Sequence, residues 1–424
     1  MDIAIPTSKG LKGTYSIPGD KSISHRAMMI GSLAEGVSEI RGYSAAADPQ
    51  STRRCFSDLG ITIEERNDVL VVHGKGLYGL KSAGKDLDCG NSGTTMRLLS
   101  GILAGQKFSS TLIGDASLSK RPMKRIMDPL RLMGAQIHGT VQNTAPLQIQ
   151  SVDRLNAIRY EMPVASAQVK SAILFSGLFA DGETTVIESI PTRDHTERML
   201  GCHVRTEDGK YIATIQGGKN ISAGSFLVPG DISAATFFMV AASIVPNSEI
   251  QIADVGLNPS RTEIIAVLQS LGCNIAVENK RVMNGEELGD LVIRSSELKG
   301  NVHIHGETVA ALIDEIPALT IAALFSDGTF TLHNAKELRA KETDRIAALV
   351  ANLRLLGVEV EEYEDGYSFV GGQQLHGASL ASYDDHRIAM AFGVAGLIIE
   401  GITIRDAGCV NISFPKFWEQ ILHT

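Results

Sequence analysis

The chain has few cysteines, no long apolar run and no excess of positive charge. Its five cysteines among 424 residues are widely spaced and form no CxxC pair, which excludes a disulfide framework and a structural zinc site. No apolar stretch reaches about 18 residues and the N-terminus lacks a basic segment, so we expect neither a membrane-spanning nor a secreted protein. The net charge of −9 disfavours nucleic acid as a partner, and a cytoplasmic protein is expected.

Several common catalytic motifs are also missing. The chain contains no GxGxxG fingerprint after a strand, no HExxH and no GxSxG. The GDKS segment at 19–22 is similar to a phosphate-binding loop, but Asp20 stands where the GxxxxGK[ST] pattern requires glycine. With 44% hydrophobic and 21% charged residues, the chain has the composition of an ordinary globular enzyme of two or three domains.

A Leu-Gly or Met-Gly step followed by an alternating strand recurs along the chain, at Gly60, Gly134, Gly201, Gly272 and Gly357. Each glycine is expected to end an amphipathic helix in the left-handed conformation. A more apolar helix type alternates with these, predicted at 95–105, 168–182, 233–247, 317–328 and 386–401, with an opening helix ending near residue 36. A period of roughly 70 residues predicts six repeats, each with one buried helix, one half-exposed helix and short strands, the last copy at 414–422.

The tripeptide PGD occurs at 18–20 and again at 229–231, each time directly before an apolar helix. Because proline and glycine interrupt regular structure, we expect hinges there, between a domain formed by residues 1–20 and 231–424 and a second formed by 21–230, with three repeats each. The first strand, at 14–17, then belongs with the C-terminal half. In the alternative interpretation both segments are simple helix-entry turns.

Small polar and charged residues recur where the buried helices should begin. Lys21 and Arg26 fall in the predicted first turn of a helix, where the backbone already carries partial positive charge, so an anion is expected beside them. Asp20 or Ser22 can cap this helix. Similar polar entries are GNSGTTMR at 90–97, SAQVK at 166–170, DEIP at 314–317 and DDHR at 384–387.

Loops at 118–122, 192–195 and 339–345 add further cations. Taken singly, Lys120 and Arg121 are explained as solvated loop charges, and Lys341 with Arg345 as an ordinary i,i+4 pair on a helix surface. Their recurrence at equivalent points of a repeat instead favours a site for small anions with phosphate and carboxylate groups. Division of the cations between two domains predicts closure on ligand binding. Asp314 and Glu342 stand out as candidate acid/base groups in this basic setting. His25 and His386 each precede a motif arginine and are either substrate contacts or structural histidines.

Six segments together resemble the 5-enolpyruvylshikimate-3-phosphate synthase family: PGDKSISHR at 18–26, GNSGT at 90–94, KRPM at 120–123, SAQVKS at 166–171, KETDR at 341–345 and DHR at 385–387. The resemblance covers nearly the whole chain. It implies an α/β fold of two inside-out α/β barrel domains, each of three βαβαββ repeats, with the active site in the interdomain cleft. It also implies transfer of the enolpyruvyl group of phosphoenolpyruvate to the 5-hydroxyl of shikimate 3-phosphate with release of phosphate, by a monomer that needs no metal or organic cofactor.

The resemblance implies roles for individual residues. Shikimate 3-phosphate would be bound by Lys21, Ser22, Arg26, Ser166, Ala167, Gln168, Arg193, Asp314 and Lys341. Phosphoenolpyruvate would be bound by Lys21, Gly93, Arg121, Gln168, Arg345 and Arg387. Asp314 would take the proton of the 5-hydroxyl, and Glu342 with Lys21 would protonate the methylene carbon. Because Gly93 leaves room beside this site, inhibition by glyphosate is a further hypothesis.

The chain departs from some relatives at two points. Ile412 stands where many have the lysine of a KTFP segment, and Arg193 stands in a loop where some have a serine and a tyrosine. The alignment at Asp314 leaves Glu315 as an alternative base. Two alternative functions are transfer to a nucleotide-linked amino sugar, against which the absence of a cysteine at 114–122 argues, and binding of a phosphometabolite without catalysis, against which Asp314 and Glu342 argue.

Overall fold

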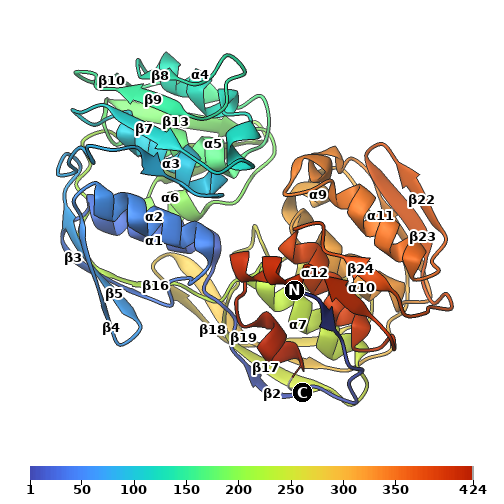
Figure 1. The fold of residues 1–424 in the computed structure, drawn as a ribbon. Helices are drawn as coiled ribbons and strands as arrows, with labels where there is room; N and C mark the ends of the chain where they lie inside the picture. The colour runs from blue at the N-terminus through green and yellow to red at the C-terminus, as the bar shows by residue number, and fades with distance from the viewer. Residues whose placement is uncertain (423–424) are drawn as a thin grey trace. The chain divides into compact units, whose positions relative to one another are not determined.

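The computed structural model describes residues 1–422, which form two compact units (Figure 1). Unit 1 comprises Met1–Pro18, Pro229–Arg281 and the chain from Glu287 onward, and unit 2 comprises Gly19–Val228 and Val282–Glu286. Each unit has its own apolar core. No helix within residues 1–422 is long and apolar enough to cross a membrane.

Unit 2 contains three sheets of four strands with one shared connectivity. In each sheet the first two strands are parallel and the last two form an antiparallel hairpin. The first repeat contains β16 (Ser225–Leu227), α1 (Lys21–Leu33), β3 (Glu35–Arg41), α2 (Ala47–Asp58), β4 (Thr62–Arg66) and β5 (Val69–Lys75). The second contains β6 (Leu87–Asp88), α3 (Gly93–Leu103), β7 (Ser110–Ile113), η1 (Leu118–Lys120), α4 (Lys124–Leu132), β8 (Gln136–His138) and β9 (Leu147–Gln150). The third contains β11 (Arg159–Glu161), α5 (Ala167–Gly177), β13 (Glu183–Glu188), α6 (His195–Leu200), β14 (His203–Glu207) and β15 (Lys210–Gln216), and the short strands β10 (Leu155–Asn156) and β12 (Ala180–Asp181) pair separately.

Unit 1 repeats this pattern, with a shorter last sheet. Its first repeat contains β2 (Lys12–Tyr15), α7 (Ile232–Ile244), β17 (Glu249–Gly256), α8 (Glu263–Ser270), β18 (Asn274–Met283) and β19 (Glu286–Arg294). The second contains β20 (Val302–Ile304), α9 (Glu307–Leu312), α10 (Ile316–Leu324), β21 (Thr329–Leu332), η2 (Lys336–Ala340), α11 (Arg345–Leu355), β22 (Val360–Tyr363) and β23 (Gly366–Val370). The third contains β24 (Ser379–Ala381), α12 (His386–Gly396), β25 (Thr403–Arg405), η3 (Ala407–Ile412) and α13 (Phe417–Leu422), and the N-terminal strand β1 (Ile3–Ala4) completes its sheet.

The expected βαβαββ repeat is confirmed, and two repeats exchange their first strands. Strand β2 leads into α1 in sequence but pairs with β17 of unit 1, whereas β16 leads into α7 but pairs with β3 of unit 2. The chain therefore changes units on both sides of residues 19–228. The turn Val282–Glu286 also belongs to unit 2, where Asn284 accepts a bond from the Leu227 amide at 3.0 Å.

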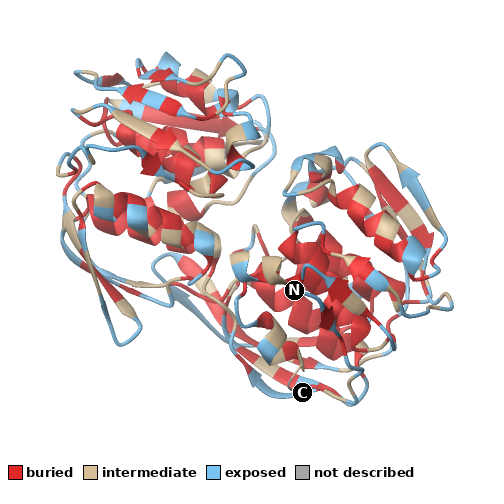
Figure 2. Ribbon diagram, viewed as in Figure 1, coloured by how far each residue is buried: buried red, intermediate tan, exposed pale blue. Residues whose placement is uncertain are grey.

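In each repeat one helix is almost completely buried. Helices α7, α10 and α12 contact one another in unit 1, and α3 contacts both α1 and α5 in unit 2. Figure 2 shows these helices predominantly in the colour of buried residues. Helices α7 and α10 meet apolar neighbours on all sides, so their sequences are apolar all round and lack the one-sided stripe of a surface helix, whereas α1, α3 and α5 also carry Arg26, Arg97 and Lys170.

The predicted helices are confirmed, with shorter ends. The five glycines that follow α2, α4, α6, α8 and α11 all have positive φ, between 59° and 91°, as expected of helix-terminating glycines. The buried helices stop before the predicted 105, 182, 247, 328 and 401, because a tight turn separates the last helical residue from the glycine or asparagine used to mark the end.

The contact between α3 and α5 yields a prediction about stability. A Cβ atom built on Gly101 would overlap the carbonyl oxygen of Ala172, and backbone cannot move aside as a flexible side chain can. We expect Gly101→Ala to lower the free energy of unfolding by about 1–3 kcal/mol through overpacking, despite the better helix propensity of alanine. Gly224→Ala, which meets open space in the same unit, is the matched control. Urea unfolding with equal midpoints for the two variants would contradict this packing.

Candidate functional site

Polar side chains cap the buried helices of unit 2. A carboxylate oxygen of Asp20 accepts from the Ile23 amide at 2.8 Å, and the hydroxyls of Ser92 and Ser166 accept from amides in the first turns of α3 and α5 at 3.1 and 3.4 Å. These caps fix the helix entries from which most of the predicted binding residues project. Asp20 is therefore the cap of α1, and Ser22 is not.

Lys21 and Arg26 differ in their surroundings. Lys21 Nζ lies 3.0 Å from Asp48 of α2, so an anion of the protein already lies beside it. Arg26 does not lie in the first turn as predicted, because α1 begins at Lys21 and places it in the second turn. It donates to the hydroxyl of Thr196 at 2.6 Å, to the carbonyl of Ser22 at 2.9 Å and to the hydroxyl of Ser171 at 2.7 Å.

All three acceptors of Arg26 are neutral, although its side chain is buried. The pKa of this guanidinium is lowered to about 10, chiefly by burial and also by the positive charge of Arg193, against the opposing effects of Glu197, Asp20 and Glu286. Arg193 lies in the loop between β13 and α6 and is partly exposed. A buried cation bonded to neutral groups, with a second cation nearby, favours binding of an anion at this position.

A second group of site residues joins α3 to α5. Arg97 donates to Gln168 at 2.6 Å, and Gln168 in turn donates to the Thr94 hydroxyl at 2.9 Å. A Cβ atom on Gly93 would lie 2.8 Å from the Arg97 guanidinium and 3.5 Å from that of Arg121. The structure thus brings the predicted Gly93, Arg121 and Gln168 together, around Arg97.

In unit 1, Arg345 is the centre of a carboxylate cluster. Its guanidinium lies 2.7 Å from Asp385, 2.7 Å from Glu342 and 3.6 Å from Asp314. Burial on its own would lower the pKa of Arg345, but the three carboxylates raise it above its ordinary value. The arginine side chain is 1% exposed, whereas those of Asp314 and Glu342 are 18% and 27% exposed. The two candidate acid/base groups are therefore partly exposed, although the guanidinium that they contact is buried.

Arg387 and Lys341 complete this group. Arg387 donates to the Asp314 carbonyl at 2.8 Å, and its Nε lies 3.9 Å from the Asp314 carboxylate. Lys341 precedes α11, so it does not form a helical i,i+4 pair with Arg345. Ile412, which stands at the family's lysine position, ends η3 and is partly buried.

The alternative base Glu315 is excluded by its surroundings. Glu315 is 1% exposed, hydrogen-bonded to the Ser233 hydroxyl and 3.4 Å from Arg261, which is itself buried. A change in its charge would leave Arg261 without this partner in the protein interior. Only Asp314 of the adjacent pair has the exposure that proton exchange with a substrate requires.

Three residues of these clusters were not predicted from the sequence as site residues. Arg97 and Asp385 were visible in the motifs at 90–97 and 384–387, and their charge at a helix entry was the available signal. Arg261 lies outside every motif. The histidines are structural in this conformation: His25 is fully buried with Nδ1 2.6 Å from the Thr52 hydroxyl, and His386 is 1% exposed.

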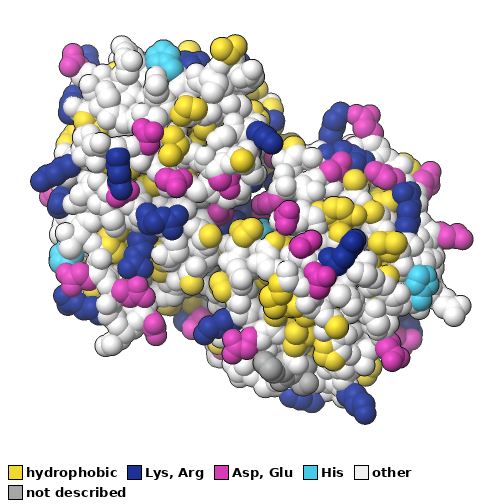
Figure 3. All heavy atoms as spheres, in the orientation of Figure 1, with side chains coloured by type: hydrophobic (Ala, Val, Ile, Leu, Met, Phe, Trp, Pro, Cys, Tyr) yellow, Lys and Arg dark blue, Asp and Glu magenta, His cyan; other side chains and the backbone are white. Residues whose placement is uncertain are grey.

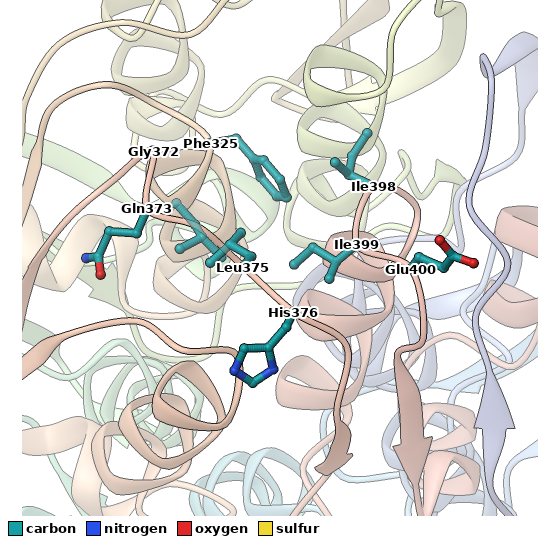
Figure 4. Close-up of a pocket in the computed structure, with 9 residues that line it drawn as sticks. Phe325, Gly372, Gln373, Leu375, His376, Ile398, Ile399 and Glu400 are labelled. Atoms are coloured by element: carbon teal, nitrogen blue, oxygen red, sulfur yellow. The ribbon is translucent and has the colours of Figure 1, made fainter.

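Two further features lie apart from these residues. A pocket of about 410 Å³ is formed in unit 1 beyond the C-terminal ends of α10 and α12, with Phe325, Leu375 and Ile399 facing it and Glu400 at its edge (Figure 4). Within the described residues, its lining includes no lysine or arginine, so it does not suit an anion.

Residues 1–422 also contain no group of three or more His, Cys, Asp or Glu side chains that could hold a metal ion. On the face drawn in Figure 3, acidic and basic side chains are interspersed.

Unit 2 carries capped entries at its three buried helices with arginines beside them, and in unit 1 Arg345 and Arg387 lie at the entries of α11 and α12, an arrangement typical of α/β proteins that bind small anions. The sequence matches the family described as EPSP synthase (3-phosphoshikimate 1-carboxyvinyltransferase) over residues 5–421, and the chain belongs to that family.

Its relatives match over almost their full length. The chain is 50% identical to the 3-phosphoshikimate 1-carboxyvinyltransferase of Salinibacter ruber and 49% identical to that of Pelobacter propionicus, covering 98% and 97% of those proteins and 98% of itself in both cases. A solved EPSP synthase from Acinetobacter baumannii superposes with a TM-score of 0.89 at 45% identity, covering 99% of this chain and 97% of that one. The two-domain α/β fold expected from the sequence is confirmed.

The burial of His25 predicts a pH dependence of stability. Burial lowers its pKa to about 3, and Lys21 and Arg26 add to this effect while Asp48 opposes it. The unfolded chain binds the proton near pH 6.5 and the folded chain does not, so stability is lost as the pH falls below about 6.5. Between pH 7 and pH 5, wild type should lose about 2 kcal/mol more than His25→Gln, measured by urea unfolding. Parallel pH profiles of the two proteins would show that His25 gains a proton in the folded state.

Proposed function

We propose that this chain transfers the enolpyruvyl group of phosphoenolpyruvate to the 5-hydroxyl of shikimate 3-phosphate and releases phosphate. The observation that carries the proposal is the contact of two partly exposed carboxylates, Asp314 and Glu342, with the buried guanidinium of Arg345. A buried arginine needs one carboxylate partner, and fully buried Asp385 supplies it, so two further and partly exposed carboxylates favour a role in proton transfer over anion binding alone. Full-length membership in the family supports the same conclusion.

The two substrates impose opposite demands on the site. Each carries a phosphate and a carboxylate, so both need cations, and their mutual repulsion has to be overcome before they can react. We assign shikimate 3-phosphate chiefly to the residues around Arg26 in unit 2: Lys21, Ser22, Ser166, Ala167, Gln168 and Arg193, with Asp314 and Lys341 from unit 1. We assign phosphoenolpyruvate to Lys21, Gly93, Arg121, Gln168, Arg345 and Arg387. An enzyme that holds two reactants in attack geometry lowers the activation barrier by about 7–11 kcal/mol in favourable cases.

Asp314 is the proposed general base. Its carboxylate accepts the proton of the 5-hydroxyl as that oxygen attacks C2 of phosphoenolpyruvate, while Glu342, with Lys21, delivers a proton to the methylene carbon. The resulting tetrahedral intermediate loses phosphate as the methylene carbon gives its proton back, which restores the double bond. The neighbouring arginines stabilise the charge that develops on the phosphate.

The structure suggests how Glu342 becomes available. Its carboxylate lies 2.7 Å from Arg345. Anionic groups of phosphoenolpyruvate that bind Arg345 compete with Glu342 for this guanidinium. Substrate binding would therefore release Glu342 for proton transfer, while Asp385, which is fully buried, continues to hold the arginine at 2.7 Å.

A phosphate-release assay tests the proposed reaction. Release is expected only when shikimate 3-phosphate and phosphoenolpyruvate are present together, because phosphate leaves only after the hydroxyl has attacked. Each substrate alone is the control for simple hydrolysis, and a nucleotide-linked amino sugar in place of shikimate 3-phosphate tests the alternative acceptor. Absence of release with both substrates, or release with the amino sugar, would overturn the assignment.

Isosteric variants test the two carboxylates. Asp314→Asn and Glu342→Gln should each lower kcat by about 10²–10⁴, the usual contribution of a general acid or base, and change the Kd of shikimate 3-phosphate far less. The measurements are steady-state phosphate release and calorimetric titration of shikimate 3-phosphate. A loss of binding as large as the loss of turnover would show that these residues hold substrate and do not transfer protons. Glu337→Gln, an exposed carboxylate on η2, is the matched control.

A further inference from the structure

A buried cluster of charges lies in unit 2, around Lys170 of α5. The lysine side chain is 0% exposed, and its ammonium lies 2.6 Å from Glu188 and 2.7 Å from Glu197, both 1% exposed. Its third contact, at 3.2 Å, is the carbonyl oxygen of Thr192. The ammonium group therefore donates two hydrogen bonds, to Glu188 and to the Thr192 carbonyl, and forms an ion pair with Glu197, so its partners come from three different segments.

The acceptors are themselves held in place. The Thr192 hydroxyl donates to the second carboxylate oxygen of Glu188 at 2.5 Å, so Glu188 ties the loop to the end of β13. The ring of Tyr211 lies 5.1 Å from the lysine ammonium. Burial raises the pKa of Glu197, and the charge of Lys170 opposes that rise.

Such a cluster is costly if stability is its only purpose. Charges removed from water lose several kcal/mol of solvation each, and buried ion pairs can often be replaced by apolar side chains without loss of stability. A buried ammonium with two directed hydrogen bonds and a close ion pair instead fixes the relative positions of the segments that supply its partners. The question is which segments these are.

Helix α5 and the loop of Thr192 carry residues assigned above to shikimate 3-phosphate, and α6 contacts another of them, Arg26. Helix α5 begins with Ser166, Ala167 and Gln168, one turn before Lys170. Arg193 follows Thr192 directly. Glu197 follows Thr196, whose hydroxyl accepts a bond from Arg26 at 2.6 Å, and Ser171, next to Lys170, accepts another at 2.7 Å.

We propose that Lys170 is a positioning residue for the sugar-phosphate subsite, and that through Glu188, Thr192 and Glu197 it holds Arg193 and Arg26 beside the entry of α5. Lys170 does not touch the substrate, because it is completely buried. The role rests on the proposed function, since it presumes that these arginines bind the phosphate of shikimate 3-phosphate.

Glu188→Gln is the variant that tests this role. It keeps the shape of the side chain and leaves Lys170 paired with Glu197, so the protein should fold. The weaker hold on Lys170 and Thr192 should raise the Kd of shikimate 3-phosphate about tenfold, the size expected for one lost hydrogen bond to a charged group. At saturating shikimate 3-phosphate, kcat and the KM for phosphoenolpyruvate should stay within about twofold of wild type, well below that tenfold change.

Two further variants complete the comparison. Glu161→Gln changes the same kind of residue in the same sheet, where Glu161 forms an exposed pair with Lys210 at 2.5 Å, and should leave every constant unchanged. Lys170→Met removes the ammonium and leaves two buried carboxylates unpaired, so its folding is checked by urea unfolding. If it folds, its Kd for shikimate 3-phosphate should rise more than that of Glu188→Gln.

The outcomes separate the two proposals. Unchanged shikimate 3-phosphate binding in folded Glu188→Gln would overturn the positioning role. So would a loss of similar size in kcat, in the affinity for shikimate 3-phosphate and in the KM for phosphoenolpyruvate. Failure of wild type to bind shikimate 3-phosphate would instead contradict the proposed function. Titration of inorganic phosphate then decides the positioning role by itself: weaker phosphate binding by Glu188→Gln than by wild type supports it, and equal binding overturns it.

Discussion

The site depends on one constraint: a helix that is buried along its length still exposes unpaired backbone amides at its first turn. In this chain those helix entries are linked to one another by side chains. Arg26 of α1 bonds Ser171 of α5, Gln168 of α5 bonds Thr94 of α3, and Arg387 of α12 bonds the carbonyl of Asp314 before α10. Partial positive charge and real cations therefore accumulate at the same ends of the helices, and anions are the ligands that such ends favour.

The positive charge of the arginines is balanced differently in the two units. In unit 1 Arg345 is surrounded by three carboxylates, so its charge is compensated before any ligand arrives. In unit 2 Arg26 is bonded only to neutral groups. Arg26, which feels the charge of carboxylates but is not hydrogen-bonded to any, suits a ligand that supplies a lasting negative charge, such as the phosphate of an acceptor substrate. Arg345, whose charge is compensated, suits proton transfer. When one of its carboxylates leaves it to transfer a proton, another carboxylate remains beside the guanidinium, so no buried charge is left unpaired.

Much of the fold could be predicted because its signals are local. A glycine with positive φ after each half-exposed helix, and apolar helices without a polar side, both follow from residues a few positions apart. The repeated PGD tripeptide already placed the first strand with the C-terminal half, and β2 does pair with β17 there. The partner strands of β2 and β16 could not be predicted in the same way, since these short strands are distinguished only by distant partners. The prediction of a charged helix entry was similarly incomplete at Lys21, whose partner Asp48 lies on the next helix.

Buried charges were the least visible part of the site. Lys170 stands in an apolar helix, and its motif gives no indication that Glu188 and Glu197 both reach it. A sequence shows that a lysine is present, but not whether water or a carboxylate surrounds it. The residues that orient a site are consequently harder to recognise than those that bind its ligands, whose charges recur at the helix entries.

Asp314 and Glu315 show how the fold assigns different tasks to neighbouring residues of similar chemistry. Glu315 stands directly before α10 and bonds Ser233 of α7, where Arg261 also reaches it. Asp314, one residue earlier, faces Arg345 and Arg387 and stays partly exposed. The buried carboxylate lies beside Arg261 and accepts a bond from Ser233, and it thereby anchors the start of the helix. Its neighbour can then change protonation state while the backbone beneath it stays fixed, which is what a general base requires.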